Sequence, residues 1–214
     1  MDDGYTPGMD TISATRTQRR AAATRQSIID AAKAILAEMG AAALTIETVA
    51  DRADVAVQTI YNRVGGRSAI LLAVAELAMV ENRDYMDEAY ALPGTIEERL
   101  LRTATAYTRF ALERPHEFRL LIEPPDDPEA LSRIAGLIDE QNSKLAATIS
   151  DGVTEGVIDS VADPRLLADA LWAMWNGMLS LGWRTDSLRV EPDQMPQLLN
   201  TAADVILAGL RHRP

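Results

Sequence analysis

Apolar residues recur every three or four positions along almost the whole chain, and no segment of any length alternates apolar and polar residues. A spacing of three or four places side chains on one face of an α-helix, whereas a strand requires a period of two. The first clear stripe consists of Ile28, Ile29, Ala32, Ile35, Leu36 and Met39. Gly40 follows it, and glycine suits the C-terminal cap of a helix. The pattern predicts an all-α fold.

Capping residues and prolines divide the chain into about nine helical segments. Thr95 with Glu98 three positions later forms a capping box, and Asp127-Pro128 and Asp163-Pro164 each combine an N-cap with proline at the first helical position. The expected helices span residues 16–39, 46–53, 57–64, 67–90, 95–114, 115–123, 128–155 and 164–185, with a last one after Pro192-Asp193 to about residue 212. Residues 1–15 contain Pro7 and two glycines and are expected to form a disordered arm.

The composition excludes several functional classes. The chain has 214 residues, of which 47% are hydrophobic and 25% charged, a globular profile that fits one or two domains. It contains no cysteine and only two histidines, so no thiolate nucleophile and no zinc site built from cysteines or several histidines is available. The sequence shows no apolar run long enough to span a membrane and no secretory signal. We therefore expect a cytoplasmic protein without a metal or other cofactor.

The charge is distributed unevenly. The whole chain carries a net charge of −11, but residues 11–72 hold eight basic and five acidic side chains, a local charge of +3. Residues 73–214 hold 13 basic and 24 acidic side chains. A cationic N-terminal third on an anionic body favours contact with a polyanion such as DNA, although chance asymmetry explains a charge of +3 about as well.

Two short helices, expected at 46–53 and 57–64, are joined by Asp54-Val55-Ala56, which is the layout of a helix-turn-helix. A small apolar wedge can hold them together. It comprises Val49, Ala53, Val55, Ile60 and Val64, with Ala50 small enough for close approach. The outer face of the second helix offers Gln58, Thr59, Asn62 and Arg63, residue types that read base edges in the major groove. The alternative is an ordinary helical corner with a solvated face.

The stretch ILAEMGAAALTIETVADRADVAVQTIYNRVGGRSAILLAV resembles the N-terminal domain of the TetR family of bacterial transcriptional regulators. The matching features are Gly40 after the first helix, Thr45 before the second, Val49-Ala50 within it, Thr59-Ile60-Tyr61 in the recognition helix and the Gly-Gly-Arg loop that follows. The resemblance covers roughly residues 24–75, about a quarter of the chain. It implies sequence-specific binding to double-stranded DNA.

The resemblance also implies which residues contact DNA. Thr45 would meet a phosphate at a helix N-terminus, and Tyr61 and Arg67 would reach phosphates as well. Val57, Gln58 and Thr59 would lie in the major groove. Three arginines at the start of the first helix would line phosphates or enter the minor groove. These are Arg16, Arg19 and Arg20.

Two positions depart from the family pattern. Asp54 stands where the family usually has glycine in the turn, and we expect the turn to survive because aspartate tolerates the left-handed conformation better than most residues. Ala56 replaces a usual serine and removes one hydroxyl. Both changes lower the expected affinity for DNA, since Asp54 also adds negative charge.

Eight of the ten aromatic residues lie at Tyr85 or beyond, where they can fill a core or line an apolar pocket. The resemblance favours a pocket, because the second domain of this family usually binds an effector. The segment WAMWNGMLSL also resembles a Trp-His-Gly signature of one branch, with asparagine in place of the histidine. The candidate effector-binding residues are Tyr107, Phe110, His116, Phe118, Trp172, Trp175 and Asn176.

The expected helix 164–185 is apolar on two faces, so it needs two surfaces to bury against. One seam has the spacing of a coiled coil and comprises Leu167, Leu171, Met174, Met178 and Leu181. The last helix adds Met195, Leu198, Ala202 and Val205 at helical spacing. A fully buried central helix explains the same pattern, but the resemblance favours a homodimer joined by a four-helix bundle about a two-fold axis.

Two polar features have ordinary structural explanations. Asp126-Asp127-Pro128-Glu129 gathers carboxylates, but its proline favours a loop and helix cap over a metal site. His116 follows Pro115 at a helix start, where a cap or surface role is favoured over a polar anchor for an effector.

Together these observations predict a ligand-responsive, homodimeric DNA-binding regulator, a repressor released from an inverted-repeat operator by a small apolar or aromatic effector. Residues 16–66 are expected to form the DNA-binding domain, 67–90 a linking helix, and 91–214 the effector-binding and dimerisation domain. The alternative is a helical small-molecule-binding protein that does not bind DNA. An enzyme is disfavoured, because only carboxylate chemistry would be left to it.

Overall fold

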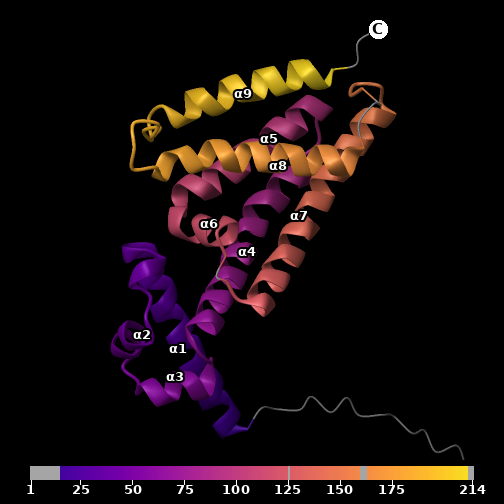
Figure 1. Cartoon of the computed structure of the whole chain (residues 1–214). Helices are drawn as coiled ribbons and strands as arrows, with labels where there is room; N and C mark the ends of the chain where they lie inside the picture. Colours follow the sequence, from indigo (N-terminus) through magenta and orange to yellow (C-terminus); the bar gives the residue numbers. More distant parts are fainter. Residues whose placement is uncertain (1–14, 125, 160–162, 212–214) are drawn as a thin grey trace, which may run out of the picture.

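The computed structural model describes residues 15–124, 126–159 and 163–211, and every regular element within these ranges is helical (Figure 1). The α-helices are α1 (Arg16–Met39), α2 (Ile46–Ala53), α3 (Val57–Arg63), α4 (Arg67–Ala91), α5 (Ile96–Glu113), α6 (Pro115–Ile122), α7 (Pro128–Thr154), α8 (Pro164–Ser180) and α9 (Met195–Leu210). Two 3-10 turns, η1 (Ala41–Ala43) and η2 (Leu181–Trp183), follow α1 and α8. The predicted all-α fold is confirmed, and the expected arm at 1–15 lies, except for Thr15, outside the described residues.

The predicted start signals cap the helices as expected. The Thr95 hydroxyl accepts a hydrogen bond from the Glu98 amide at 3.3 Å, and the Glu98 carboxylate accepts one from the Thr95 amide at 2.9 Å. Asp127 accepts from the amides of Glu129 and Ala130 and thereby caps α7, which confirms the structural explanation of this acidic segment. Asp163 caps α8 in the same manner. These local signals fix where α5, α7 and α8 begin.

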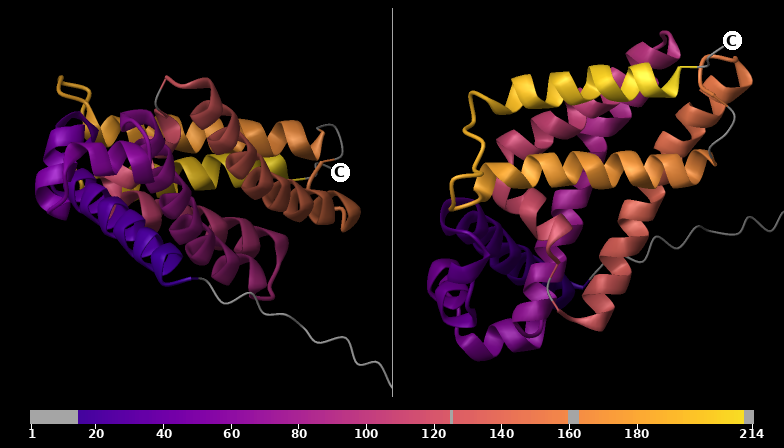
Figure 2. Two further views of the ribbon diagram at one scale, coloured as in Figure 1. Left: turned by 90° about the horizontal axis from the view of Figure 1, so that it is seen from below. Right: turned by 45° about the horizontal axis from the view of Figure 1, so that its top comes forward.

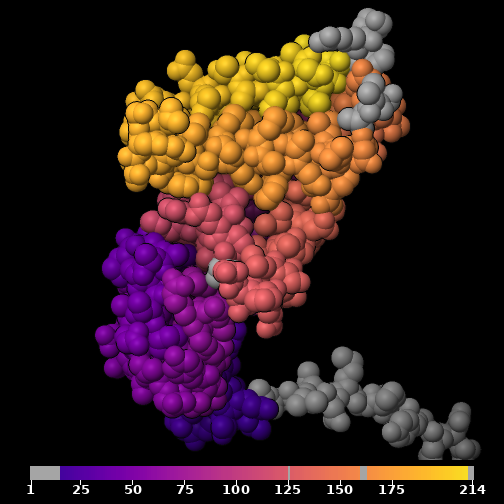
Figure 3. All heavy atoms as spheres, viewed as in Figure 1, coloured from indigo at the N-terminus to yellow at the C-terminus, as the bar shows by residue number. Residues whose placement is uncertain are grey.

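The helices separate into two ends joined by α4 (Figures 1 and 2). α1 to α3 and the start of α4 pack together at one end of the molecule. α8 and α9 lie side by side at the opposite end, where they cover the other helices of the C-terminal half (Figure 3). The arrangement therefore places the helix-turn-helix and the last two helices at opposite ends of one chain.

One continuous apolar core connects the two ends. It runs from Ile28 and Ile35 in α1, through Ile70 and Val74 in α4, to Leu199 in α9. Phe110 and Phe118 are the largest fully buried side chains, and their ring centroids lie 6.3 Å apart in an edge-to-face arrangement. These two residues were candidates for the effector site, but the structure places them in this core, where aromatic rings supply the bulk of the packing.

α4 and α7 run parallel in a constant register. Three ion pairs join them, Glu76 with Arg133, Arg83 with Glu140 and Asp87 with Lys144, and each pair is separated by 57 residues. A constant offset between ion-paired positions requires that both helices advance in the same direction at the same level. The register brings residues near 82 in α4 beside residues near 140 in α7.

Candidate nucleic-acid interface and ligand cavity

The helix-turn-helix forms around the predicted wedge. Val49 and Ile60 are fully buried, and Val55 and Val64 pack against the same core. Asp54 ends α2 in the left-handed conformation, with φ 52° and ψ 50°, and among the described residues it is the single non-glycine residue with positive φ. The expectation that the turn survives without glycine is confirmed, because the polar side chain of aspartate lowers the cost of this conformation.

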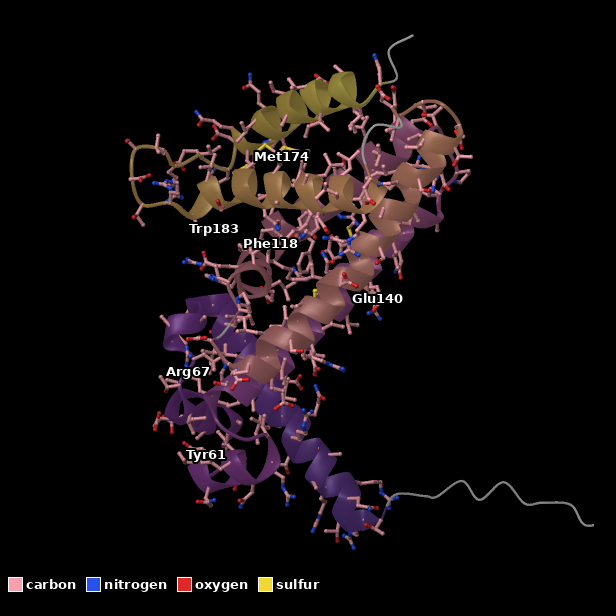
Figure 4. All side chains as sticks on the ribbon, turned by 45° about the vertical axis from the view of Figure 1, so that its right-hand side comes forward. Tyr61, Arg67, Phe118, Glu140, Met174 and Trp183 are labelled. Atoms are coloured by element: carbon pink, nitrogen blue, oxygen red, sulfur yellow. The ribbon has the colours of Figure 1, made fainter. Side chains whose placement is uncertain are left out.

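The outer face of α3 is free for contact. Gln58, Asn62 and Arg63 are exposed, and the Gln58 amide donates to Asn62 Oδ1 at 3.2 Å. Tyr61 is 53% exposed, which leaves its hydroxyl free to reach a phosphate. Val57 is also exposed, whereas Thr59 is half-buried. Gln58, Tyr61 and Asn62 therefore share one open side of α3, whereas Thr59 turns partly inward, and Figure 4 shows Tyr61 at this end of the molecule.

Thr45 and Arg67 both serve the structure around α2. The Thr45 hydroxyl accepts from the Thr48 amide at 3.1 Å, so it caps α2 at the place where the family resemblance sets a phosphate. Arg67 donates to the carbonyl of Leu44 at 2.8 Å and to that of Ala41 at 2.7 Å. Two donors of Arg67 therefore hold the start of α4 to the turn before α2, and the remaining N–H groups are left for a phosphate.

The start of α1 presents the three predicted arginines. Arg16, Arg19 and Arg20 are exposed in the first two turns, directly after a capping box in which the Thr15 hydroxyl accepts from the Gln18 amide at 3.2 Å. A rigid first turn fixes the directions in which these side chains leave the helix. The start of α1 and α3 lie at the same end of the molecule (Figure 1).

A cavity of about 120 Å³ lies among α4, α5, α6, α7, α8 and α9. When volume is measured in the same way, a single water molecule needs only ~10–15 Å³, so the cavity has room for an organic ligand. Most of its wall is aliphatic or aromatic, and no charged side chain is among the described residues that line it. The candidates Tyr107, Trp172 and Trp175 line this cavity.

A hydrogen-bond network fixes the aromatic wall. The Tyr107 hydroxyl donates to Asn176 Oδ1 at 2.8 Å and accepts from Trp172 Nε1 at 3.2 Å. Burial raises the pKa of Tyr107 more than these two partners lower it, so the phenol stays neutral. Trp175 Nε1 donates to Thr108 at 2.9 Å. Asn176 therefore acts behind the wall, as the partner of Tyr107, and does not line the cavity.

His116 lies outside the cavity, at the contact between α6 and α1. Its ring packs so closely on Gly40 that a Cβ at that position would lie 3.3 Å from His116 Nδ1. At the other end of α6, Leu121 and Ile122 line the cavity. One short helix thus contacts both the cavity and the end of α1. The predicted role of His116 as an effector anchor finds no support in this position.

The polar wall residues that sequence reasoning missed include Asn82 in α4 and Gln141 in α7. Both are buried, with 3% and 8% of their surfaces exposed. A sequence signal for Asn82 exists, because it interrupts the apolar line that runs from Ala78 and Met79 to Met86. A lone amide on such a line indicates either a buried polar contact or a ligand site.

The predicted dimer residues divide between the inside and the surface of the chain. Leu167 packs against the smaller core around Ile149, Leu171 lines the cavity, and Met178 packs against the main core. Met195 is only 2% exposed, and Leu181 and Leu198 are also partly buried, so these residues have little area to give a partner. Ala202 is half-buried. Met174 and Val205 are exposed, at 45% and 68%.

The outer face of α8 and α9, which includes Met174 and Val205 of the predicted set, is apolar and open. On α8 it comprises Leu166, Ala170, Ala173, Met174 and Gly177, and on α9 Val205, Ala208 and Gly209. Leu166 is 69% exposed, and a Cβ added at either glycine would meet nothing within 4 Å. Figure 4 shows Met174 on α8 beside α9. The surface is about one residue displaced from the predicted seam, because the inner side of α8 is used for the cavity and the cores.

The described residues contain no group of three or more acidic or histidine side chains placed to hold a metal ion. No helix among them is both long and apolar enough to cross a bilayer.

Many solved structures share this fold. A protein of unknown function from Rhodococcus sp. RHA1 is 19% identical and matches with a TM-score of 0.73 over 96% of this chain and 100% of its own. The TetR family transcriptional regulator PfmR from Thermus thermophilus is 22% identical, with a TM-score of 0.66 over 94% and 100%. The fatty acid degradation regulator FadR from Bacillus halodurans is 20% identical, with a TM-score of 0.70 over 89% and 97%. No curated protein sequence matches the chain.

The fold and the exposed recognition helix define a helix-turn-helix protein whose helical C-terminal part encloses a cavity. Residues 28–74 match the model of the bacterial regulatory proteins of the tetR family, and residues 100–206 match the tetracyclin repressor-like C-terminal domain. The chain belongs to the TetR family of bacterial transcriptional regulators. It is a DNA-binding regulator with the fold that its sequence predicts.

Proposed function

We propose that the protein is a homodimeric repressor that leaves a palindromic operator when a small apolar effector enters the cavity. The exposed face of α3 carries the proposal, because Gln58, Tyr61 and Asn62 present hydrogen-bonding groups on one open side of the helix, where they can reach base edges or phosphates. In this proposal the effector favours a conformation that does not bind DNA, and a preference of ~1–3 kcal/mol is enough for a measurable response. The proposal assigns no catalytic step to the chain and places it in the cytoplasm.

The proposed roles of the three segments follow the sequence prediction. Residues 16–66 would read DNA, 67–90 would link the two parts and add Asn82 to the wall of the cavity, and 91–214 would supply the rest of the effector site and dimerise. The basic side chains at the start of α1 and the face of α3 support the first assignment. The cavity supports the assignment of the effector site to the C-terminal part. α6, which contacts both the cavity and the end of α1, would transmit the presence of the effector to the DNA-binding domain.

The open apolar face of α8 and α9 would be covered by a second copy. A surface with Leu166 and Val205 more than two-thirds exposed is unfavourable in water. The glycines at 177 and 209 leave room for close approach of another helix. Two recognition helices would then enter successive major grooves, with centres ~34–36 Å apart.

The test is selection of random duplex DNA on the purified protein, followed by titration of the selected duplex in rising salt. We expect an enriched inverted repeat and an affinity that falls steeply with salt, because phosphate contacts release counterions. Enrichment of a single half-site would contradict the dimer. No enrichment at low salt would favour the alternative, a helical ligand-binding protein without DNA binding.

A further inference from the structure

The cavity wall contains three buried hydrogen-bonding atoms without a partner. They are Asn82 Nδ2, Gln141 Nε2 and Gln141 Oε1. An unpaired buried polar group is costly, so native structures keep such groups mainly where a ligand or a water satisfies them. A further unpaired amide, Asn176 Nδ2, does not line the cavity.

The other polar side chains of the wall are already engaged. Tyr107 and Trp172 bond to each other, Trp175 donates to Thr108, and Thr103 donates to the carbonyl of Arg99 at 2.9 Å. Asn142 Nδ2 donates to Asp169 at 3.0 Å. Tyr90 also lines the wall, and its hydroxyl is hydrogen-bonded with Thr103. The buried atoms of the described wall that have no partner are therefore those of Asn82 and Gln141.

These two amides lie at the same level of the cavity. Their chain neighbours Arg83 and Glu140 form an ion pair at 3.0 Å on the outside of the α4–α7 contact, within the parallel register of the two helices. Asn82 and Gln141 therefore line the cavity from two neighbouring helices, and they do not bond to each other. A ligand group between them would meet two N–H donors and one carbonyl acceptor.

We propose that the effector is an uncharged molecule with an apolar body and one carboxamide-like end, a carbonyl with an adjacent N–H. The carbonyl accepts one hydrogen bond from Asn82 Nδ2 and one from Gln141 Nε2, and the N–H donates to Gln141 Oε1. A single amide thereby satisfies all three unpaired atoms, while the apolar body fills the aliphatic and aromatic part of the cavity. The inference rests on the proposed function, because it names the chemistry of the effector of the same cavity.

A carboxylate does not fit this wall. It has no donor for Gln141 Oε1, and no cation among the described lining residues compensates the loss of its hydration. An ester or ketone accepts the two N–H groups but leaves Gln141 Oε1 unpaired. The wall therefore distinguishes ligands that share the same apolar body and differ only in the polar end.

The test uses the full chain without DNA. Straight-chain amides from hexanamide to decanamide are titrated beside the methyl esters and the carboxylates of the same acids, with calorimetry and with the fluorescence of Trp172 and Trp175, which line the cavity. At neutral pH we expect each amide to bind roughly tenfold more tightly than its ester, the equivalent of one hydrogen bond, and the carboxylate to bind least.

Two substitutions assign the contacts separately. Gln141→Leu removes the acceptor and one donor, so the amide should lose its advantage over the ester. Asn82→Leu removes one donor to the carbonyl, so the affinities for amide and ester should fall together and their ratio should stay. Both variants should melt at a higher temperature than the unliganded wild type, because each removes an unpaired buried polar group. Damage to the fold would lower both the affinity and the melting temperature. A lower affinity together with a higher melting temperature therefore indicates the loss of a ligand contact.

Asn142→Leu is the matched control, since Asn142 lines the same cavity but its amide is engaged with Asp169. The Asn142→Leu variant should have a lower melting temperature, because it loses the hydrogen bond to Asp169. It should keep the wild-type ratio of the affinities for amide and ester. The proposal is overturned if the carboxylate binds as tightly as the amide, if Gln141→Leu keeps the wild-type ratio, or if no chain of the series binds. Amide binding that leaves operator binding unchanged would instead contradict the proposed release mechanism and leave the ligand class standing.

Discussion

Lys33 in α1 and Arg114 between α5 and α6 share one carboxylate, that of Glu81 in α4. Lys33 Nζ lies 2.9 Å from one Glu81 oxygen, and Arg114 Nε lies 2.8 Å from the other. Burial acts to raise the pKa of Glu81, but the two hydrogen bonds outweigh it and hold the pKa below its ordinary value. The DNA-binding end and the start of α6 are thus joined through a single side chain.

Glu81→Gln should lower the free energy of unfolding by about 1 kcal/mol at neutral pH, because two partly exposed ion pairs lose their charge. A carboxylate with a lowered folded-state pKa stabilises above its ordinary pKa of 4.5 and ceases to do so as the pH falls through the lower value. Urea unfolding at neutral and acidic pH should show that the difference from wild type disappears in acid. Glu76→Gln, which breaks the more exposed pair with Arg133, should cost less. Equal costs at both pH values would contradict this account.

Asp54→Asn and Asp54→Ala separate charge from conformation in the turn. Asparagine tolerates the left-handed conformation, so the first variant should keep its stability and bind DNA about two- to fivefold more tightly at low salt. Alanine does not, so the second should lose about 1 kcal/mol of stability. Thermal melts and fluorescence anisotropy with the selected duplex measure the two effects. Similar melting temperatures for both variants would show that the φ of 52° carries no cost.

Gln58→Ala and Tyr61→Ala should weaken operator binding and leave the melting temperature unchanged, since both side chains are exposed. Loss of a base contact by Gln58 should cost about 1–3 kcal/mol and relax the preference for the correct base. Loss of a phosphate contact by Tyr61 should weaken binding to all sequences alike. Ser132→Ala on α7 is an exposed control. Normal binding by both variants would refute the placement of α3 in the groove.

Gly177→Arg should prevent dimerisation without affecting the folded monomer. A Cβ at Gly177 meets nothing within 4 Å in a single chain, so the arginine can collide only with a partner. Light scattering after gel filtration measures the mass, and the melting curve reports the fold. Gly136→Arg on α7 is the matched control, because this helical glycine also faces open space and lies outside the open face of α8 and α9. A dimer in the Gly177→Arg variant would place the interface elsewhere.

The sequence by itself determined the helices and the recognition face, because these depend on interactions between residues close in the chain. Thr95 and Glu98, Asp127 with Pro128, and Gly40 act within one turn of helix, so their effect can be read locally. The expected end of α8 near 185 was too late, since the helix stops at Ser180 and continues as the turn η2. A hydrogen bond from beyond the helix holds this end, because the Val190 amide donates to the Leu181 carbonyl at 3.1 Å.

Only the tertiary structure decided what the C-terminal apolar residues do. Phe110, Phe118 and Trp172 are all aromatic residues of the C-terminal half, and the sequence does not distinguish their roles. In the structure Phe110 and Phe118 lie in the core, whereas Trp172 lines the cavity. Leu171 and Met174 are both apolar and only three residues apart on α8, but Leu171 lines the cavity and Met174 faces outward. Asn82 and Gln141 come to the same level of the cavity through the register of α4 and α7, which no local pattern encodes. The hydrophobicity of a side chain determines that it is buried. The packing of helices that are distant in the chain determines whether it faces a core, a ligand or a partner.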